Sequence, residues 1–193
     1  MLGLEHPQTA TTYNNIANAY KELGDYKNAL YYCEKSLAIR KRVLGPEHLD
    51  TAGSYNSLAG IYQDKGDYES ALRYYERALD IYEKVLGAEH QDTATTYNNI
   101  AGVYYDQNDF GKALEYYEKA LEIKERVLGP EHPNTANTYH NLGILLYEMK
   151  RYPESEQYLQ KAYAVFEKVL GRDHQYTKNT LTYLELVQRA MGK

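Results

Sequence analysis

Apolar side chains recur along the chain with the spacing of amphipathic helices, and the pattern breaks at regular points. In residues 51–64 the apolar positions lie three and four residues apart and so share one helix face: Tyr55, Leu58, Ala59 and Tyr62. Gly66 predicts the end of this helix, because glycine readily adopts the left-handed conformation found at helix ends. Asp67 follows as a capping residue for a second helix. We therefore expect a helical hairpin.

The second helix of this hairpin is expected to continue as far as Val85. Its apolar face comprises Tyr68, Ala71, Leu72, Tyr75, Ala78, Leu79 and Tyr82. Gly87 supplies the next stop, after which the same pattern starts again.

The hairpin is one of several copies. The dipeptide Leu-Gly recurs every 42 residues, at Leu2, Leu44, Leu86, Leu128 and Leu170. A fixed period of this length is the signature of stacked helical repeats. We expect a single array with repeats at residues 2–43, 44–85, 86–127 and 128–169, followed by a capping helix at 170–193. The predicted fold is all-α: an alpha-alpha superhelix of four helical hairpins plus a C-terminal capping helix.

The turn inside each hairpin changes from copy to copy. It reads Gly24-Asp25, Gly66-Asp67, Asn108-Asp109 and Lys150-Arg151. Asparagine tolerates the left-handed conformation and lysine does so less readily, so we expect the fourth turn to be the loosest. Pro153 falls in the first turn of the following helix, where its missing N–H is harmless.

The two ends of the array differ in polarity. The small residue at Ala17, Ala59, Ala101 and Gly143 becomes Glu185 in the last helix, and Gln188 replaces a core tyrosine there. Because an unpaired buried carboxylate is costly, this helix is expected to face water as a cap. The first helix has no such polar change, so we expect an open edge at the first hairpin, where a preceding repeat or another molecule would stack.

Composition and charge exclude several classes of function. The net charge of −5 and the pI of about 5.7 argue against a nucleic-acid-binding face, which needs clustered basic residues. The single cysteine, Cys33, forms no internal disulfide and favours a reducing, cytoplasmic location. The sequence has no basic-then-apolar leader and no apolar run of membrane length, so we expect no membrane partner.

The segment from Tyr13 to Leu30 reads Tyr-Asn-Asn-Ile-Ala-x-x-Tyr-x-x-x-Gly-Asp-Tyr-x-x-Ala-Leu, which resembles the tetratricopeptide (TPR) consensus. The resemblance covers essentially the whole chain. Ordinary TPR units have about 34 residues, whereas these have 42 because the second helix continues, for example through Ile39 to Val43. This longer unit is similar to the repeats of kinesin light chains and to sensor arrays of signalling ATPases.

No set of residues predicts catalysis, a metal or a cofactor. Five histidines recur at one linker position, so their side chains are too far apart to share a metal and are interpreted as helix-entry residues: His6, His48, His90, His132 and His174. Cys33 aligns with Tyr75, Tyr117 and Leu159 and is expected to fill core space. The basic run 40–42 is interpreted as a solvated helix end, and the charge-rich segment 115–126 as an exposed outer face.

The recurring asparagines are the strongest functional signal, because asparagine is a poor helix former. The resemblance implies that the first helices of TPR hairpins line a concave groove, where amides hydrogen-bond an extended peptide. The predicted groove residues are Asn14, Asn15, Asn18, Asn56, Ser57, Gln63, Asn98, Asn99, Tyr105, Asn137, His140 and Asn141. The alternative is that some asparagines tie adjacent helices together.

The groove positions also predict the charge of the partner. Chaperone-tail clamps of this fold use basic residues at positions that here are Asn14, Asn18, Ser57, Thr95 and Asn99, so a carboxylate clamp is not expected. The groove instead adds Glu22, Asp64, Asp106 and Glu148, which favour a neutral or basic segment. We therefore expect a non-catalytic protein-interaction scaffold. The alternative is a structural segment that forms homo-oligomers through its N-terminal hairpin.

Overall fold

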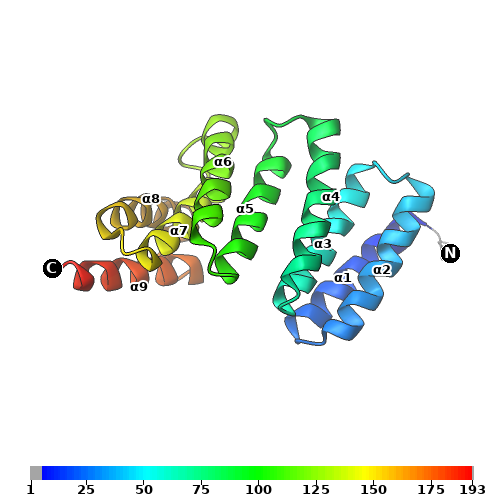
Figure 1. Cartoon of the computed structure of the whole chain (residues 1–193), viewed down its shortest axis with the longest axis horizontal. Coiled ribbons are helices and arrows are strands. Elements are labelled where there is room, and N and C mark those ends of the chain that lie inside the picture. Colours follow the sequence, from blue (N-terminus) through cyan, green and yellow to red (C-terminus); the bar gives the residue numbers. More distant parts are fainter. Residues whose placement is uncertain (1–5, 193) are drawn as a thin grey trace. The chain divides into compact units, whose positions relative to one another are not determined.

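A computed structural model describes residues 6–192, and over this range the chain forms nine α-helices and no strand (Figure 1). The helices are α1 (Pro7–Glu22), α2 (Tyr26–Val43), α3 (Leu49–Asp64), α4 (Tyr68–Leu86), α5 (Gln91–Asp106), α6 (Phe110–Leu128), α7 (Pro133–Glu148), α8 (Tyr152–Leu170) and α9 (Gln175–Ala190). The all-α prediction is confirmed. The chain divides into two compact units, an N-terminal unit, Met1–Val103, and a C-terminal unit, Tyr104–Lys193.

The linker between hairpins is fixed by a recurring pair of side-chain hydrogen bonds. In the second repeat His48 caps α3 by accepting, at Nδ1, a hydrogen bond of 3.1 Å from the backbone N–H of Asp50. Thr51 donates its hydroxyl hydrogen to the carbonyl of Gly45 at 2.8 Å. The same histidine cap recurs at His6, His90, His132 and His174, and the same threonine bond at Thr93, Thr135 and Thr177. The interpretation of the histidines as helix-entry residues is therefore confirmed.

The turns inside the hairpins have the predicted left-handed residue. Gly66 has φ +82°, and Asn108 and Lys150 adopt φ 60° and 59° at the equivalent position. Asp67 then caps α4 by accepting from the backbone N–H of Ser70 at 3.2 Å. Arg151 makes no such cap, so α8 begins without the side-chain hydrogen bond that the other turns have. That the fourth turn is the loosest stays a prediction.

Small residues allow the two helices of a hairpin to approach closely. In the N-terminal unit Ala17 of α1 and Ala29 of α2 are fully buried, and Cys33, Leu58 and Ile61 complete the same cluster. In the C-terminal unit α7 packs on α8 and α8 on α9, around Leu159, Leu184 and Val187. At Gly143 of α7 a Cβ atom would lie 2.5 Å from Cγ of Leu159, so this position accepts glycine alone without a shift of its neighbours.

Tyrosines pack in pairs across each hairpin. Tyr20 of α1 stacks on Tyr32 of α2 with ring centroids 5.5 Å apart, and Tyr62 of α3 stacks on Tyr74 of α4 at 5.4 Å. Tyr104 and Tyr116 repeat this arrangement in the C-terminal unit. These stacked tyrosines therefore fill the space between the two helices of a hairpin.

The last helix has the polar surface that its sequence predicted. Glu185 of α9 is exposed, and Gln188 is half-buried and donates to Glu156 of α8 at 3.3 Å. The proposed limits of the repeats and of the capping helix stay predictions, and their ends at residues 2–5 and 193 lie outside the described residues.

Candidate partner-binding face

The N-terminal unit presents polar side chains along its first helices. Helices α1 and α3 contact each other directly, and Figure 1 shows them side by side. Asn15 and Asn18 of α1 are exposed. Ser57 of α3 is half-buried and donates its hydroxyl hydrogen to the carbonyl of Gly53 at 3.1 Å. The two exposed amides are therefore free of helix packing and open to a partner.

Asn14 and Asn56 occupy the same position in successive repeats, and both lie at contacts between helices. Nδ2 of Asn56 donates to the hydroxyl of Thr96 in α5 at 3.3 Å, while Oδ1 of Asn56 is buried and has no hydrogen-bond partner. Oδ1 of Asn14 lies 3.8 Å from Sγ of Cys33 in α2. At this position the amides contact side chains of neighbouring helices, as the alternative interpretation expects.

His140 of α7 is the equivalent of Asn56 in the C-terminal unit. Its Nδ1 lies 2.9 Å from the hydroxyl of Thr180 in α9, and that hydroxyl also donates to the carbonyl of Tyr176 at 2.7 Å. Since the hydroxyl has one hydrogen, a neutral His140 with its proton on Nδ1 satisfies both contacts. Burial lowers the pKa of His140 to about 4, so the imidazole stays uncharged near neutrality. This side chain is thus a structural link between α7 and α9.

The other predicted groove residues are half-buried. Asn98 and Asn99 belong to the part of α5 in the N-terminal unit, and Asn137 and Asn141 lie on α7. Oε1 of Gln63 accepts a hydrogen bond of 3.3 Å from the Tyr75 hydroxyl.

Tyr105 lies in the C-terminal unit, with its ring centroid 5.8 Å from that of Phe110. Burial, followed by the negative charge of Glu148, raises the pKa of Tyr105. Each unit therefore contributes a separate group of candidate residues.

Acidic residues end the first helices, as the sequence predicted. Glu22, Asp64, Asp106 and Glu148 are all exposed. In the N-terminal unit Nζ of Lys21 lies 3.3 Å from Oδ2 of Asp64, which joins α1 to α3 and neutralises part of that charge. Because the pair is partly exposed, its contribution to stability is small.

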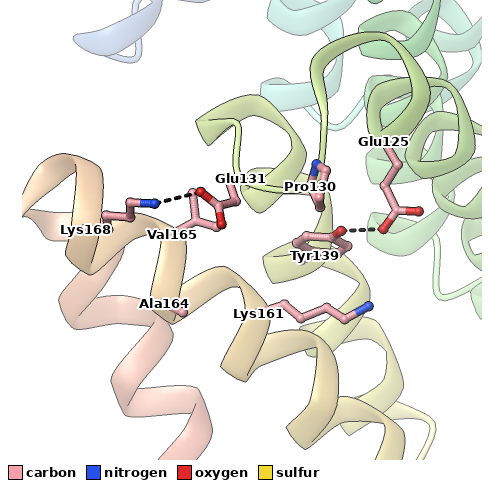
Figure 2. Close-up of a pocket in the computed structure, with 8 residues that line it drawn as sticks. All are labelled: Glu125, Pro130, Glu131, Tyr139, Lys161, Ala164, Val165 and Lys168. Carbon is pink, nitrogen blue, oxygen red and sulfur yellow. Dashed lines mark hydrogen bonds and ion pairs between the residues drawn. The ribbon is translucent and has the colours of Figure 1, made fainter.

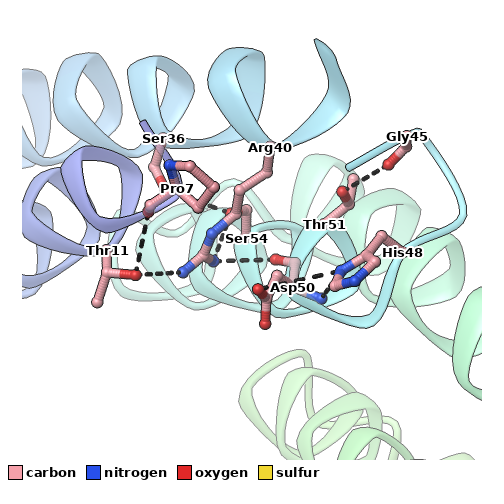
Figure 3. A network of polar contacts seen from close by, with 9 residues as sticks. All are labelled: Pro7, Thr11, Ser36, Arg40, Gly45, His48, Asp50, Thr51 and Ser54. Carbon is pink, nitrogen blue, oxygen red and sulfur yellow. Dashed lines mark hydrogen bonds and ion pairs between the residues drawn. The ribbon is translucent and has the colours of Figure 1, made fainter. Parts of the chain in front are cut away.

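Arg40 is a residue whose role the sequence interpretation missed. It was assigned to a solvated helix end, and that assignment is wrong. Its guanidinium reaches from α2 to both α1 and α3 (Figure 3). Nη1 donates to the carbonyl of Asp50 and to the hydroxyl of Ser54 on α3, each at 2.9 Å. Nη2 donates to the hydroxyl of Thr11 on α1 at 3.4 Å. The repeat register could have indicated this role. The residues at the same repeat position, Tyr82 and Phe166, are large aromatic residues, and both are buried.

Lys124 corrects the description of segment 115–126 as wholly exposed. Lys119 and Glu115 do form an exposed ion pair at 2.7 Å. Lys124, however, is 4% exposed, and its Nζ donates to the hydroxyl of Thr138 at 3.0 Å. Burial lowers its pKa to about 8. It shares the repeat position of Arg40 and likewise faces the following first helix.

The cysteine thiol and the possible metal ligands show no arrangement for catalysis or metal binding in the described residues. Cys33 is fully buried, and burial raises the pKa of its thiol to about 12. Within residues 6–192 no group of three or more histidine, cysteine, aspartate or glutamate side chains is arranged to hold a metal ion. In the same range no helix is both long and apolar enough to cross a membrane.

Known proteins share this architecture. The chain is similar to the structure of BtubC (BKLC) from P. vanneervenii, with 26% sequence identity over 96% of this chain and 74% of that one and a TM-score of 0.82. A Podosopora anserina protein assigned as a kinesin light chain, with nearly identical TPR-like repeats, is 24% identical over 97% and 88% of the two chains, with a TM-score of 0.78.

The apo form of RapI is 22% identical over 95% of this chain and 64% of that one, with a TM-score of 0.78. At these lower identities the likeness shows the fold alone. A comparison with curated proteins finds no significant match. The Tetratricopeptide repeat model matches residues 8–84, 50–126, 92–168 and 135–193. Nearly every residue of the chain falls within one of these matches, and the chain belongs to the tetratricopeptide repeat family.

Proposed function

We propose that this chain is a non-catalytic scaffold that binds a neutral or basic peptide segment, or a partner helix, on the face formed by its first helices. The TPR fold is consistent with a protein-interaction scaffold. The observation that carries the finer proposal is the exposure of Asn15 and Asn18 beside acidic helix ends. An exposed amide offers a donor and an acceptor to an extended backbone, and the carboxylates favour a cationic neighbour.

We assign the predicted residues to two groups with different expected roles. Asn15, Asn18 and Asn99 are assigned to the partner, together with Ser57 and Asn141. Asn56 and His140 are assigned to contacts between helices, because their polar atoms meet threonines of the next first helix. Each partner hydrogen bond contributes about 0.5–1.5 kcal/mol, so several are needed for micromolar binding.

This division defines the test. The full chain is screened against immobilised arrays of neutral, basic and acidic peptides. The triple variant Asn15→Ala, Asn18→Ala, Asn99→Ala is expected to lose about tenfold or more in affinity for the selected neutral or basic peptides and to keep its unfolding midpoint. The single variant Asn56→Ala is the matched control. It is expected to lose stability more than affinity, because it removes the contact with Thr96.

Equal binding by the triple variant and the wild type would contradict the assignment of the face. Selection of acidic peptides that depend on these three residues would contradict the charge preference.

Self-association through the N-terminal hairpin is a second candidate. Leu23 is 79% exposed and Tyr31 is 53% exposed, so the first hairpin presents two large apolar side chains to solvent. If they form an interface, the solution mass of the chain rises with concentration, and the variant Leu23→Ser with Tyr31→Ser stays monomeric. A mass that is monomeric at every concentration excludes this candidate.

A further inference from the structure

A basic notch lies beside α3 in the N-terminal unit. It has a volume of about 490 Å³ and is lined by Leu37, Lys41, Pro46, Tyr55, Arg73, Tyr74 and Arg77. Its walls come from α2, α4 and the linker, while Tyr55 of α3 closes one side. A cavity of this size is within the usual range of ligand sites. The basic notch combines an apolar lining with three cationic side chains.

Among the described residues, none of the three cations of the basic notch forms an ion pair with a carboxylate, although, after the hydrogen bonds from Ser70, the charge of Arg73 helps to lower the pKa of Asp67. The ion pairs found there involve neither Lys41, Arg73 nor Arg77, and the guanidinium of Arg73 instead lies 5.2 Å from the ring centroid of Tyr74. The nearby Glu47 is already paired with Lys84 at 2.5 Å. Asp80 lines the adjoining part of the cleft and leaves the local excess of positive charge in place. This excess stands out in a chain with a net charge of −5.

The equivalent cleft of the C-terminal unit is neutral, although the repeat places the same backbone there. Pro130, Tyr139 and Lys161 line a cavity of about 350 Å³ at the positions that Pro46, Tyr55 and Arg77 occupy in the basic notch (Figure 2). Glu125 stands where the basic notch has Lys41, and it accepts a hydrogen bond from the Tyr139 hydroxyl. Gln157 replaces Arg73. Because Lys161 keeps the positive charge of Arg77, the excess charge of the basic notch comes from Lys41 and Arg73 and is not a requirement of the fold.

We propose that the basic notch binds an acidic protein segment that carries an aliphatic side chain. Carboxylates of the segment pair with Lys41, Arg73 and Arg77, and the aliphatic group covers Leu37 and Tyr55. Arginine binds carboxylates through two parallel hydrogen bonds, so Arg73 and Arg77 supply orientation as well as charge. A peptide fits this lining better than a simple anion, because an anion would leave the apolar wall in contact with water.

This site is separate from the face of the proposed function. On α3, Ser57 of the amide face follows Tyr55 by two residues, which is about 200° around the helix at about 3.6 residues per turn, so the basic notch and the amide face lie on different sides of that helix. The two sites also have opposite charge preferences. Each proposal is tested by its own variants, so evidence against one site does not count against the other.

The test uses the full chain and a fluorescein-labelled peptide in which two glutamates flank a leucine on each side. Binding is followed by fluorescence anisotropy at low salt. The variant Lys41→Glu with Arg73→Gln introduces the residues of the neutral cleft, and it is expected to weaken binding about tenfold or more. The matched control is Lys27→Glu with Lys35→Gln, which makes the same change in net charge at two exposed residues of α2 outside the basic notch. It is expected to bind as the wild type does.

Three outcomes would overturn the proposal. The peptide fails to bind the full chain at about 1 mM, or it binds both double variants equally well. In the third outcome inorganic phosphate or phosphatidylserine vesicles bind through Lys41 and Arg73 while the acidic peptide does not, which would make the basic notch a site for a simple anion or a lipid headgroup. Because Lys41, Arg73 and Arg77 are exposed, unchanged helicity of the variants is expected and is checked by circular dichroism.

Discussion

The two units place a basic side chain at the same repeat position, yet its surroundings differ. In the N-terminal unit Arg40 is half-buried and donates to a carbonyl and two hydroxyls on α1 and α3. In the C-terminal unit Lys124 is almost fully buried and meets the hydroxyl of Thr138. A guanidinium spreads its charge over several donors, whereas an ammonium concentrates it and is costly to dehydrate. We therefore expect the basic residue at this position to stabilise the N-terminal unit and to destabilise the C-terminal unit.

A second pair of equivalent residues shows the same contrast. Asn56 and His140 both connect a first helix to the following one, through Thr96 and Thr180. An amide has no charge to gain in acid, but an imidazole does. The link in the C-terminal unit is thus sensitive to pH, while its counterpart in the N-terminal unit is not.

Acid is expected to produce the largest difference between the units. The folded pKa of His140 is about 4, below its ordinary value of 6.5, so the unfolded chain binds more protons between these values. This link's contribution to stability is full above pH 6.5 and falls by up to about 3 kcal/mol as the pH drops to 4. Urea unfolding at several pH values measures the loss.

The variant His140→Asn is the matched control, because it gives α7 the residue found at Asn56. It should remove this part of the pH dependence. An unchanged slope between pH 6.5 and 4 would show that the imidazole is not held neutral.

Replacing Lys124 is expected to stabilise the C-terminal unit. Its folded pKa of about 8 lies below 10.5, so the unfolded state binds more protons between these values and stability rises with pH across that window. Below pH 8 the charged, buried ammonium is a constant cost. Lys124→Met keeps the length of the side chain and is expected to add about 2 kcal/mol at pH 7. Denaturant titrations at pH 7 and pH 10 measure this gain, which should shrink at the higher pH.

The two units also differ in the space available at the position of the small residue in the first helix of each hairpin. Ala17 and Ala59 fit the N-terminal unit, but Gly143 faces Leu159, whose Cγ would be 2.5 Å from an added Cβ. Gly143→Ala is therefore expected to cost about 1–2 kcal/mol despite its higher helix propensity. Thermal unfolding checks the sign. Leu159→Ala removes Cγ and Cδ2 of Leu159, the two atoms nearest to the added Cβ, so Gly143→Ala is expected to cost less in that background than in the wild type.

Arg40→Met is expected to have the smallest effect and the opposite sign from Lys124→Met. It removes three hydrogen bonds from partly exposed groups and leaves the buried Ser54 hydroxyl with fewer partners. We expect a loss of about 1 kcal/mol in the N-terminal unit. If Arg40→Met and Lys124→Met change stability in the same direction, the contrast between the two positions is wrong.

The repeat register by itself determined most of the fold. Recurring Leu-Gly dipeptides, capping aspartates and the spacing of apolar residues located the hairpins. The helix predicted over residues 51–64 corresponds to α3, which starts two residues earlier, at Leu49. These signals suffice because caps and helix faces depend on neighbours within a few residues. Cys33 and the linker histidines were interpreted correctly for the same reason.

The tertiary structure decided which polar residues are available. Asn15 and Asn56 look alike in the sequence, yet one is exposed and the other meets Thr96 from a residue 40 positions away. Arg40 and Lys124 occupy charged stretches that read as solvated, although both turn toward the next repeat. A local pattern records helix faces, but it does not record how far a long side chain reaches or what it meets, because those depend on packing between elements distant in sequence.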